Sequence, residues 1–257
     1  GEEAVLDLNI SGAYDSLYLS RAVKVQFGEY VRQNAALPTS AIIYRDGEAG
    51  VYALSKKFVY WRAVEPQEGK LDFSILSAML EAAEREGQRM VLLWFGSYKN
   101  GGLLYAPDWV QEDTQRVRRA TMETGAVLPD IACPSCTETL QCEQRALEVV
   151  GQFLAEQVIT NRVILLQVNN ESGLLGTARC YCAACKAAYA AAAERDTEQF
   201  SARQMLTYHE VLAAAFKRRH RIPCYMNAWV PSASSTGIQD YDAYGGANRA
   251  CLPYVRA

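Results

Sequence analysis

The stretch KKFVYWRAVEPQEGKLDFSILSAMLEAAEREGQRMVLLWFG, residues 56–96, contains three successive elements of secondary structure. Residues 56–61 are mostly β-branched or aromatic, which predicts a short buried strand. A turn with proline and glycine follows, and Ser74 is a suitable N-cap for the next segment. Residues 75–87 have apolar side chains at helical spacing and end at a glycine, and residues 88–96 predict a second strand. This order predicts a parallel βαβ unit.

The same alternation continues along the chain. Further strands are predicted at residues 162–168 and 222–230, further helices at 143–158, 184–196 and 198–220, and loops at 97–139 and from 231 onward. Apolar strands that alternate with helices predict a parallel sheet covered on both faces. A (β/α)8 barrel and an open doubly wound sheet both fit this α/β pattern. No glycine-rich nucleotide-binding turn follows any strand, which argues against the doubly wound nucleotide-binding fold.

The N-terminal region fits the alternation less well. Residues 41–45 predict a strand and residues 14–33 a helix. Too few residues separate the strand at 41–45 from the next strand for a full crossover helix. Residues 1–50 are therefore poorly assigned. The length of 257 residues allows one domain as readily as two, because barrels of this length are often single domains, and we take residues 1–257 as one domain.

Composition excludes several classes of function. Half of the 257 residues are hydrophobic and the net charge is −3, so no charge excess would attract nucleic acid or an anionic membrane. No apolar run reaches the length of a membrane span. The first residues lack a secretion signal and also an initiator Met. We expect a cytoplasmic protein whose given chain is processed or excerpted.

Polar and aromatic side chains collect at the predicted strand ends. In a barrel, the carboxyl ends of the strands form the active-site face. Aromatic rings stack on sugars, while amides and carboxylates bind sugar hydroxyls, so this set predicts a carbohydrate cleft. Each tryptophan taken alone is more typical of a core or a cleft wall. The predicted cleft residues are Trp61, Trp94, Asn170, Glu171, Asn227 and Trp229.

Glu171 is the candidate catalytic residue. It follows a strongly apolar strand, and Gly173 allows the chain to turn sharply after it. An isolated Asn-Glu pair usually marks a helix start or a loop, but a carboxyl at a cleft edge, partly removed from water, suits a general acid. Glycoside hydrolysis needs such an acid and a second carboxylate. Asn170 is suited to hold a substrate hydroxyl, and Glu65, at the start of a loop, is expected to be structural.

The cysteines form a second candidate site. Six of the eight lie within residues 133–185, and clustering in a chain of this size favours a metal over a disulfide framework. Structural zinc takes four thiolate or imidazole ligands. Cys180, Cys182 and Cys185 supply three. The fourth is open among Cys133, Cys136 and Cys142, with His209 and His220 less suited because they lie in a predicted helix. Ordinary buried thiols, or a redox pair at Cys182 and Cys185, are the alternatives.

A family resemblance appears in several of these segments. QVNNESG at residues 167–173 resembles the QV(E/D)NEYG segment of glycoside hydrolase families 35 and 42, the β-galactosidase families. VYWRAVEPQEGKLDFS at 59–74 is similar to their W…EP.EG.(F/Y)DF signature, APDWV at 106–110 to their PAWL segment, and CYMNAWV at 224–230 to a fifth-strand end. The resemblance covers approximately residues 58–230. It implies a retaining (β/α)8-barrel hydrolase of β-galactosides, with Glu171 as general acid/base and Asn170 as its substrate-binding neighbour.

The chain departs from the family pattern at several points. Asn169 stands where these families usually have an acidic residue, and Ser172 where they have tyrosine, which implies altered specificity. The family nucleophile follows the seventh strand and has no counterpart here, since Asp240 and Asp242 lie in a predicted loop. We therefore expect an incomplete barrel, with strands up to about the fifth or sixth, and little or no glycosidase activity from this chain alone.

The resemblance extends to the cysteines. CYCAACKAAY at residues 180–189 resembles the CYC..C..AF segment of zinc-containing family-42 enzymes, and CPSC at residues 133–136 resembles their upstream segment, in which a cysteine precedes P-(S/T)-S. The resemblance implies a structural zinc site. Its ligands would be Cys133, Cys180, Cys182 and Cys185. Four protein ligands leave no position for a reactive water.

Three functions compete at this point: a β-galactosidase-like hydrolase, an inactive carbohydrate-binding remnant, and a zinc-clipped interaction module unrelated to sugar. The expected partner is a carbohydrate, with no nucleic acid and no membrane. Family-42 enzymes are often trimeric, so the resemblance also implies a homo-oligomer.

Overall fold

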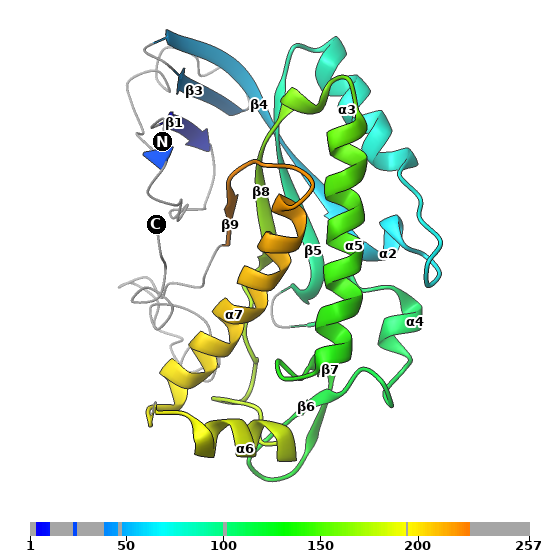
Figure 1. Cartoon of the computed structure of the whole chain (residues 1–257), viewed down its shortest axis with the longest axis vertical. Coiled ribbons are helices and arrows are strands. Elements are labelled where there is room, and N and C mark those ends of the chain that lie inside the picture. Colours follow the sequence, from blue (N-terminus) through cyan, green and yellow to red (C-terminus); the bar gives the residue numbers. More distant parts are fainter. Residues whose placement is uncertain are drawn as a thin grey trace.

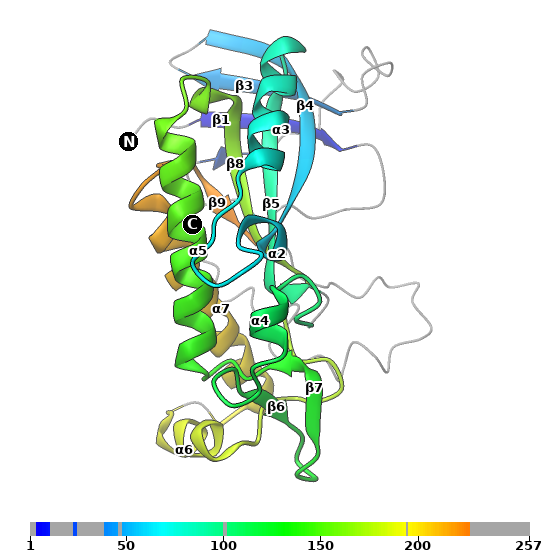
Figure 2. The same ribbon diagram turned by 90° about the vertical axis from the view of Figure 1, so that its right-hand side faces the viewer.

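The computed structural model describes residues 4–10, 23–24, 39–45, 48–99, 102–193 and 195–226 of the chain. Its centre is a set of four parallel strands, each hydrogen-bonded to the next (Figures 1 and 2). These strands are β4 (Glu48–Tyr60), β5 (Arg89–Lys99), β8 (Val163–Asn170) and β9 (Cys224–Tyr225). The long helices between them are α3 (Ser74–Arg85), α5 (Thr137–Glu156) and α7 (Thr197–Lys217).

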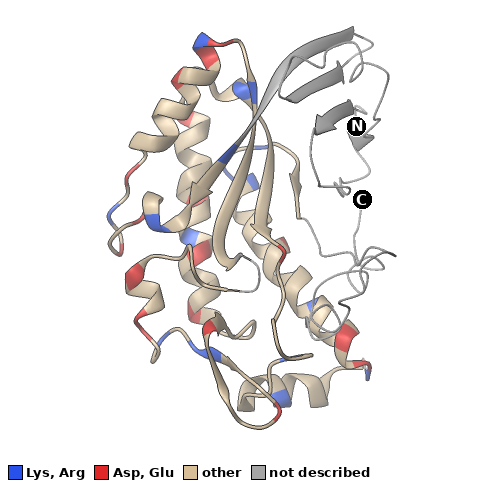
Figure 3. Ribbon diagram, turned by 180° about the vertical axis from the view of Figure 1, so that it is seen from behind, with Lys and Arg blue, Asp and Glu red and all other residues tan. Residues whose placement is uncertain are grey.

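The strand order distinguishes between the two predicted architectures. The parallel strands follow one another as β4-β5-β8-β9, which is also their order in the sequence. A doubly wound sheet reverses its order at a switch point and carries helices on both faces. In Figure 1, α5 and α7 lie in front of the strands. In Figure 3, which shows the molecule from the opposite side, the strands lie in front of these two helices, so both helices cover the same face. The described residues therefore form part of a barrel-type α/β fold.

The N-terminal strands extend this sheet differently. Strands β1 (Ala4–Ile10), β2 (Val23–Lys24) and β3 (Thr39–Arg45) complete a seven-stranded sheet of order β2-β1-β3-β4-β5-β8-β9. Strand β3 is antiparallel to both β1 and β4. An antiparallel pair needs only a short turn, which explains why no crossover helix separates β3 from β4. The strand predicted at residues 41–45 is confirmed, whereas the helix predicted at 14–33 is wrong at β2.

The segment between β5 and α5 is more ordered than predicted. It contains α4 (Asp108–Gln111) and an antiparallel pair, β6 (Arg119–Thr121) with β7 (Val127–Ala132). The expectation of a continuous loop at residues 97–139 is wrong here because these elements are too short for a clear apolar period. Figure 2 shows the pair projecting at the same end of the molecule as α6 (Ala183–Ala191). A short 3₁₀ helix, η1 (Thr160–Arg162), precedes β8.

Element boundaries also correct two local predictions. Strand β4 ends at Tyr60, and Trp61 begins the short helix α2 (Trp61–Val64). Ser74 does not cap α3, since the carboxylate of Asp72 accepts a hydrogen bond from the Ser74 N–H instead, at 2.8 Å. The predicted glycine stop is confirmed, because Gly87 follows α3 with φ of 65°.

The core lies between the sheet and its helices. Leu147 and Leu154 of α5 and Leu212 and Phe216 of α7 are fully buried, and each such side chain contributes about 1.5–3 kcal/mol on burial. Across the described residues, no helix combines the length and apolarity needed to cross a membrane.

Candidate functional site

The carboxyl end of β8 has an unusual backbone. Asn169 has φ of 57° and Glu171 has φ of 49°, a left-handed conformation that only a few per cent of non-glycine residues adopt. Asparagine tolerates this region, but glutamate gains nothing local from it. Such conformations persist where the surrounding structure imposes them, and they cluster at functional sites. The contacts of β8 with its neighbours supply that support.

Glu171 and Asn170 lie where the sequence predicted, directly after the apolar part of β8. Asn170 is buried and accepts a hydrogen bond from Gln167 Nε2 at 3.1 Å. The same nitrogen donates to the Asn169 carbonyl at 2.8 Å, so Gln167 ties the last residues of the strand together. Glu171 is half-buried at the strand end. A half-buried carboxylate at the carboxyl end of a parallel strand has the position of a catalytic residue in a barrel.

Asn169 connects the strand end to a buried carboxylate. Its Oδ1 accepts hydrogen bonds from the backbone N–H groups of Gly96 and Tyr98 at 2.9 and 3.3 Å. Its Nδ2 donates to Glu143 Oε1 at 3.1 Å. An amide can make these contacts together because it both donates and accepts, whereas a carboxylate could not donate to Glu143. The departure at Asn169 from the family's acidic residue therefore matches the presence of Glu143.

Glu143 was not predicted from the sequence. It lies in α5 with none of its surface exposed. Besides Asn169, it accepts hydrogen bonds from Trp94 Nε1 at 2.9 Å, the Ser97 N–H at 3.2 Å and the Tyr208 hydroxyl at 2.8 Å. Four donors satisfy a charge that would otherwise be costly to bury. A glutamate in an amphipathic helix normally predicts a solvent-facing position, and only the positions of its partners reveal this one.

The tryptophans predicted as sugar platforms lie in the core. Trp61 and Trp94 have no exposed surface, and their indole N–H groups donate to Glu65 and Glu143, each at 2.9 Å. As they lie here, neither ring face is open to a sugar, so their predicted binding role has no support from this structure. Asn227 and Trp229, the other two predicted cleft residues, fall outside the described part of the chain.

Glu65 has the structural role that the sequence predicted. Its carboxylate accepts from Trp61 Nε1 and from the Gly69 N–H at 2.8 Å, and its carbonyl accepts from Trp109 Nε1 at 3.1 Å. Gly69 has φ of 75°, which favours glycine. Residues 61–69 thus form one closed loop around a buried carboxylate.

Ser172, the residue after Glu171, is held by a hydrogen bond to His209 of α7. The Nδ1 of His209 lies 2.6 Å from the Met205 carbonyl, which can only accept, so Nδ1 carries the proton. Burial lowers the pKa of His209 to about 4, so the ring is neutral near pH 7. Its Nε2 is then an acceptor, and the Ser172 hydroxyl donates to it at 2.9 Å. This hydrogen bond attaches the residue after Glu171 to α7.

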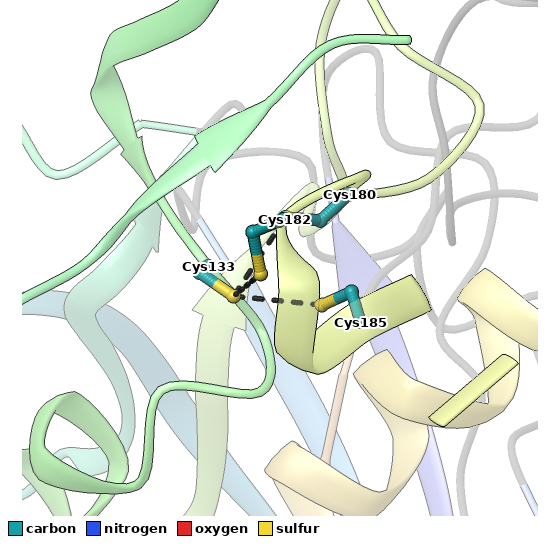
Figure 4. A group of neighbouring side chains, drawn as sticks. All are labelled: Cys133, Cys180, Cys182 and Cys185. Atoms are coloured by element: carbon teal, nitrogen blue, oxygen red, sulfur yellow. Dashed lines mark hydrogen bonds between the residues drawn. The ribbon is translucent and has the colours of Figure 1, made fainter. Parts of the chain in front are cut away.

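The cysteine cluster brings together segments that are distant in the sequence. Cys133 follows β7, Cys180 and Cys182 lie in the loop before α6, and Cys185 lies in its first turn (Figure 4). The Sγ of Cys133 lies 3.6 Å from that of Cys182, 3.5 Å from that of Cys185 and 3.7 Å from that of Cys180. All four sulfurs lie within 4.8 Å of one another.

These distances fit a tetrahedral metal ion. Sulfurs about 2.3 Å from a central zinc would lie about 3.8 Å apart. The four cysteines could therefore bind a metal ion with only small shifts. Cys136 and Cys142, left open by the sequence, lie outside the cluster: the Cys136 thiol contacts the Arg116 carbonyl at 3.3 Å, and the Cys142 sulfur lies 3.3 Å from Arg145 Nη2.

The thiols of the cluster influence one another's protonation. Hydrogen bonds with Cys133 and then Cys180 lower the pKa of Cys185. Hydrogen bonds with Cys180 and Cys185, together with burial, raise the pKa of Cys133. The backbone N–H of Thr121 also contacts the Cys180 sulfur at 3.4 Å. This arrangement favours a thiolate at Cys185, and a divalent cation would supply the charge needed to deprotonate the others.

Comparisons with known proteins bear on the family and the fold of the chain. The model of glycoside hydrolase family 42, described as β-galactosidase, matches residues 40–243. No curated protein sequence matches the chain. The β-galactosidase from Bacillus circulans sp. alkalophilus has a TM-score of 0.51 and 15% identity over 66% of this chain. A catalytic mutant of Gan42B, a GH42 β-galactosidase from G. stearothermophilus, has a TM-score of 0.54 and 15% identity over 70%.

These structural alignments cover 31% and 32% of the two solved chains, so the present chain spans about a third of their length. At such identities the likeness shows the fold alone. It assigns the described strands to a (β/α)8-barrel-type fold.

Proposed function

Because the chain belongs to the glycoside hydrolase family 42 β-galactosidases, we propose that it hydrolyses terminal β-galactosides with retention of configuration. Family membership establishes a glycosidase-type domain. The substrate, the stereochemistry and the catalytic residue are our proposal. The observation that carries it is the half-buried Glu171 at the carboxyl end of the parallel strand β8.

Glu171 is proposed as the general acid/base. Three features support this role: the left-handed backbone at Glu171, the Gln167–Asn170 hydrogen bond before it, and the Ser172–His209 hydrogen bond after it. Together they fix the backbone on both sides of the carboxylate. Catalysis by a positioned carboxyl requires such fixed geometry, since the group must lie within hydrogen-bond reach of the glycosidic oxygen.

The chemistry follows from two carboxyl groups in a retaining enzyme. Glu171 would first protonate the departing glycosidic oxygen while a second carboxylate attacks the sugar. It would then take a proton from the water that releases the sugar. Asn170 is proposed to bind a sugar hydroxyl next to the cleaved bond. We assign the attacking carboxylate to none of the described residues.

The cysteine cluster is proposed to bind structural zinc. The support is the set of four sulfurs at spacings close to those of a zinc tetrathiolate. Its four ligands would be Cys133, Cys180, Cys182 and Cys185. The ion would join the end of β7 to the start of α6 and stabilise the loop that follows Glu171. It takes no part in the proposed reaction.

The hydrolase proposal is tested with aryl β-galactosides that differ in leaving group. A phenyl group needs protonation to depart, whereas a 2,4-dinitrophenyl group does not. In a form of the protein that supplies the attacking carboxylate, Glu171→Gln should lower hydrolysis of the phenyl galactoside by about 10²–10⁴-fold. The first step on the dinitrophenyl galactoside should change far less, and azide should accelerate turnover of the covalent intermediate. Glu112→Gln, at an exposed carboxylate, is the matched control and should retain full activity.

Two results would count against this proposal. Equal losses for both leaving groups would remove the acid/base role from Glu171. If the unchanged protein binds galactose but hydrolyses neither glycoside, and a longer form that supplies the attacking carboxylate is equally inactive, it is a carbohydrate-binding protein without catalysis.

A further inference from the structure

The cysteine cluster has a polar neighbour that is not a ligand. The Ser135 hydroxyl lies 3.2 Å from Cys185 Sγ. The same oxygen accepts a hydrogen bond from Gln204 Nε2 of α7 at 2.8 Å. Gln204, Ser135 and Cys185 therefore form a continuous chain of contacts from α7 to the cluster. Cys185 itself is fully buried.

The backbone presets the position of Ser135. Residues 133–136 form a β-turn closed by a hydrogen bond from the Cys136 N–H to the Cys133 carbonyl at 2.9 Å. Pro134 occupies the second position of the turn, where its fixed φ is favourable. The Ser135 carbonyl accepts from Arg118 Nη2 at 2.9 Å, which holds the turn from outside. The Ser135 hydroxyl is thus fixed relative to Cys133, a ligand of the same centre.

Donor and acceptor chemistry sets the direction of these hydrogen bonds. The Gln204 amide nitrogen can only donate, so it occupies a lone pair of Ser135 Oγ. A Cys185 thiol donates to the same oxygen. Once that thiol has lost its proton, the hydroxyl proton of Ser135 is free for the sulfur. A metal-bound Cys185 thiolate has no proton and can only accept. Four thiolates around a divalent cation carry an excess of negative charge in a buried site, which hydrogen-bond donors to sulfur would offset.

We propose that Ser135, oriented by Gln204, is a positioning residue that holds Cys185 as a metal-binding thiolate and raises the metal affinity of the cluster. This inference rests on the proposed metal site, but not on hydrolase activity. It assigns to α7, which supplies no cysteine, a part in the metal centre.

The test measures metal binding by the full chain. Zinc affinity is measured by competition with a chromophoric chelator, and the cobalt-substituted protein reports thiolate character through its sulfur-to-cobalt charge-transfer band. Ser135→Ala should lower zinc affinity by about tenfold, the lower end for outer partners of metal ligands. It should also shift the charge-transfer band to longer wavelength, because a sulfur without its donor is more easily oxidised.

Three further variants separate this role from a general packing effect. Ser135→Thr keeps the hydroxyl and should restore zinc affinity to within about threefold of the unchanged protein. Gln204→Leu leaves Ser135 in place and should produce a smaller shift in the same direction. Ser201→Ala is the matched control: Ser201 is a buried serine of α7 whose hydroxyl has no hydrogen-bond partner among the described residues. Its removal should change neither readout.

The outcomes distinguish the inference from its premise. If Ser135→Ala binds zinc as tightly as Ser201→Ala and its cobalt band does not move, the role of Ser135 is refuted while the metal site stands. If Ser135→Ala does not fold, unchanged affinity in Gln204→Leu refutes the proposed orientation. If the unchanged protein gives no sulfur-to-cobalt band, the four cysteines do not form a thiolate metal centre. The proposed zinc site and the proposed role of Ser135 then both fail, whatever the result of the galactoside assay.

Discussion

Glu143 shows how one buried charge organises the strand end that carries Glu171. Its carboxylate joins α5 to Trp94 and Ser97 of β5, to Asn169 of β8 and to Tyr208 of α7. Each of these donors is itself buried. Removing the acceptor would leave several buried donors unpaired, which costs more than losing a solvent-exposed hydrogen bond.

We predict that Glu143→Gln lowers the free energy of unfolding by about 2–4 kcal/mol, because the new amide N–H₂ would face donors where a carboxylate oxygen accepted. Urea denaturation measures the change. Glu156→Gln, an exposed position of the same helix, is the control and should stay within about 0.5 kcal/mol of the unchanged protein. An equal effect of the two substitutions would show that the Glu143 carboxylate is not needed.

The buried His209 predicts a pH dependence of stability. Burial lowers its pKa to about 4 from the ordinary histidine value of 6.5. The unfolded state therefore binds the proton more readily, so the stabilisation is complete above pH 6.5 and is lost as the pH falls toward 4. The free energy of unfolding lost through protonation linked to His209 is of the order of 3 kcal/mol.

His209→Gln, which keeps an acceptor for Ser172, should flatten the unfolding free energy between pH 6.5 and 4 relative to the unchanged protein. Urea denaturation at several pH values measures this difference. Other titrating groups act alike in both proteins, so parallel curves would refute the assignment to His209.

At the scale of elements, α5 packs closely against α7 at Gly151. A Cβ atom on Gly151 of α5 would lie 2.8 Å from the Phe216 carbonyl oxygen of α7. That oxygen is held by the Arg219 and His220 N–H groups, each at 3.0 Å, so it cannot move away easily. The two helices can approach this closely only because residue 151 has no side chain.

We predict that Gly151→Ala destabilises the protein by about 1–3 kcal/mol, as overpacking does. Helix propensity alone predicts the opposite sign, a gain of roughly 1 kcal/mol. Thermal unfolding followed by circular dichroism measures the sign. Gln141→Ala, at an exposed position of the same helix, is the control and should be neutral or slightly stabilising. A higher melting temperature for Gly151→Ala would refute the close contact.

At the scale of the whole molecule, the cysteine cluster joins two parts that extend away from the sheet. The β6–β7 pair and α6 meet at the cluster, at the end of the molecule where both project (Figures 2 and 4). The backbone adds one link, from the Tyr181 N–H to the Thr121 carbonyl at 2.8 Å. Binding energy of a metal ion would be available to hold these segments together, because ligands that are separate in the unfolded chain meet only on folding.

We predict that removing metal with a strong chelator lowers the melting temperature by several degrees, and that added zinc restores it. In Cys133→Ser, chelator and zinc should have little effect, since one of the four ligands is lost. Cys142→Ser removes a buried cysteine outside the cluster and should keep the full response. Calorimetry measures all three proteins, and a chelator response that survives Cys133→Ser would refute this ligand set.

The sequence by itself determined the local elements of this protein and the residue types of its two sites. Hydrophobic periodicity located β5, α5, β8 and α7 because it records which face of a segment is buried. The apolar run that ends at Glu171 and the spacing of the last three cysteines were equally local signals. The strands β6 and β7 were not predicted because they are too short to show a period of apolar residues. Strand β2 was not predicted because the surrounding residues have apolar side chains at helical spacing.

The tertiary structure alone decided which distant groups meet. It placed Cys133, the fourth ligand that the family resemblance implied, beside the other three cysteines and left Cys136 and Cys142 outside, because this depends on where the end of β7 lies relative to α6. It buried Trp61 and Trp94 completely, the position more typical of a tryptophan taken alone. It also revealed Glu143, whose buried position contradicts the usual behaviour of a helix carboxylate. Burial and pairing are properties of the whole packed chain, since donors from three separate elements must converge on Glu143 before such a charge becomes stable.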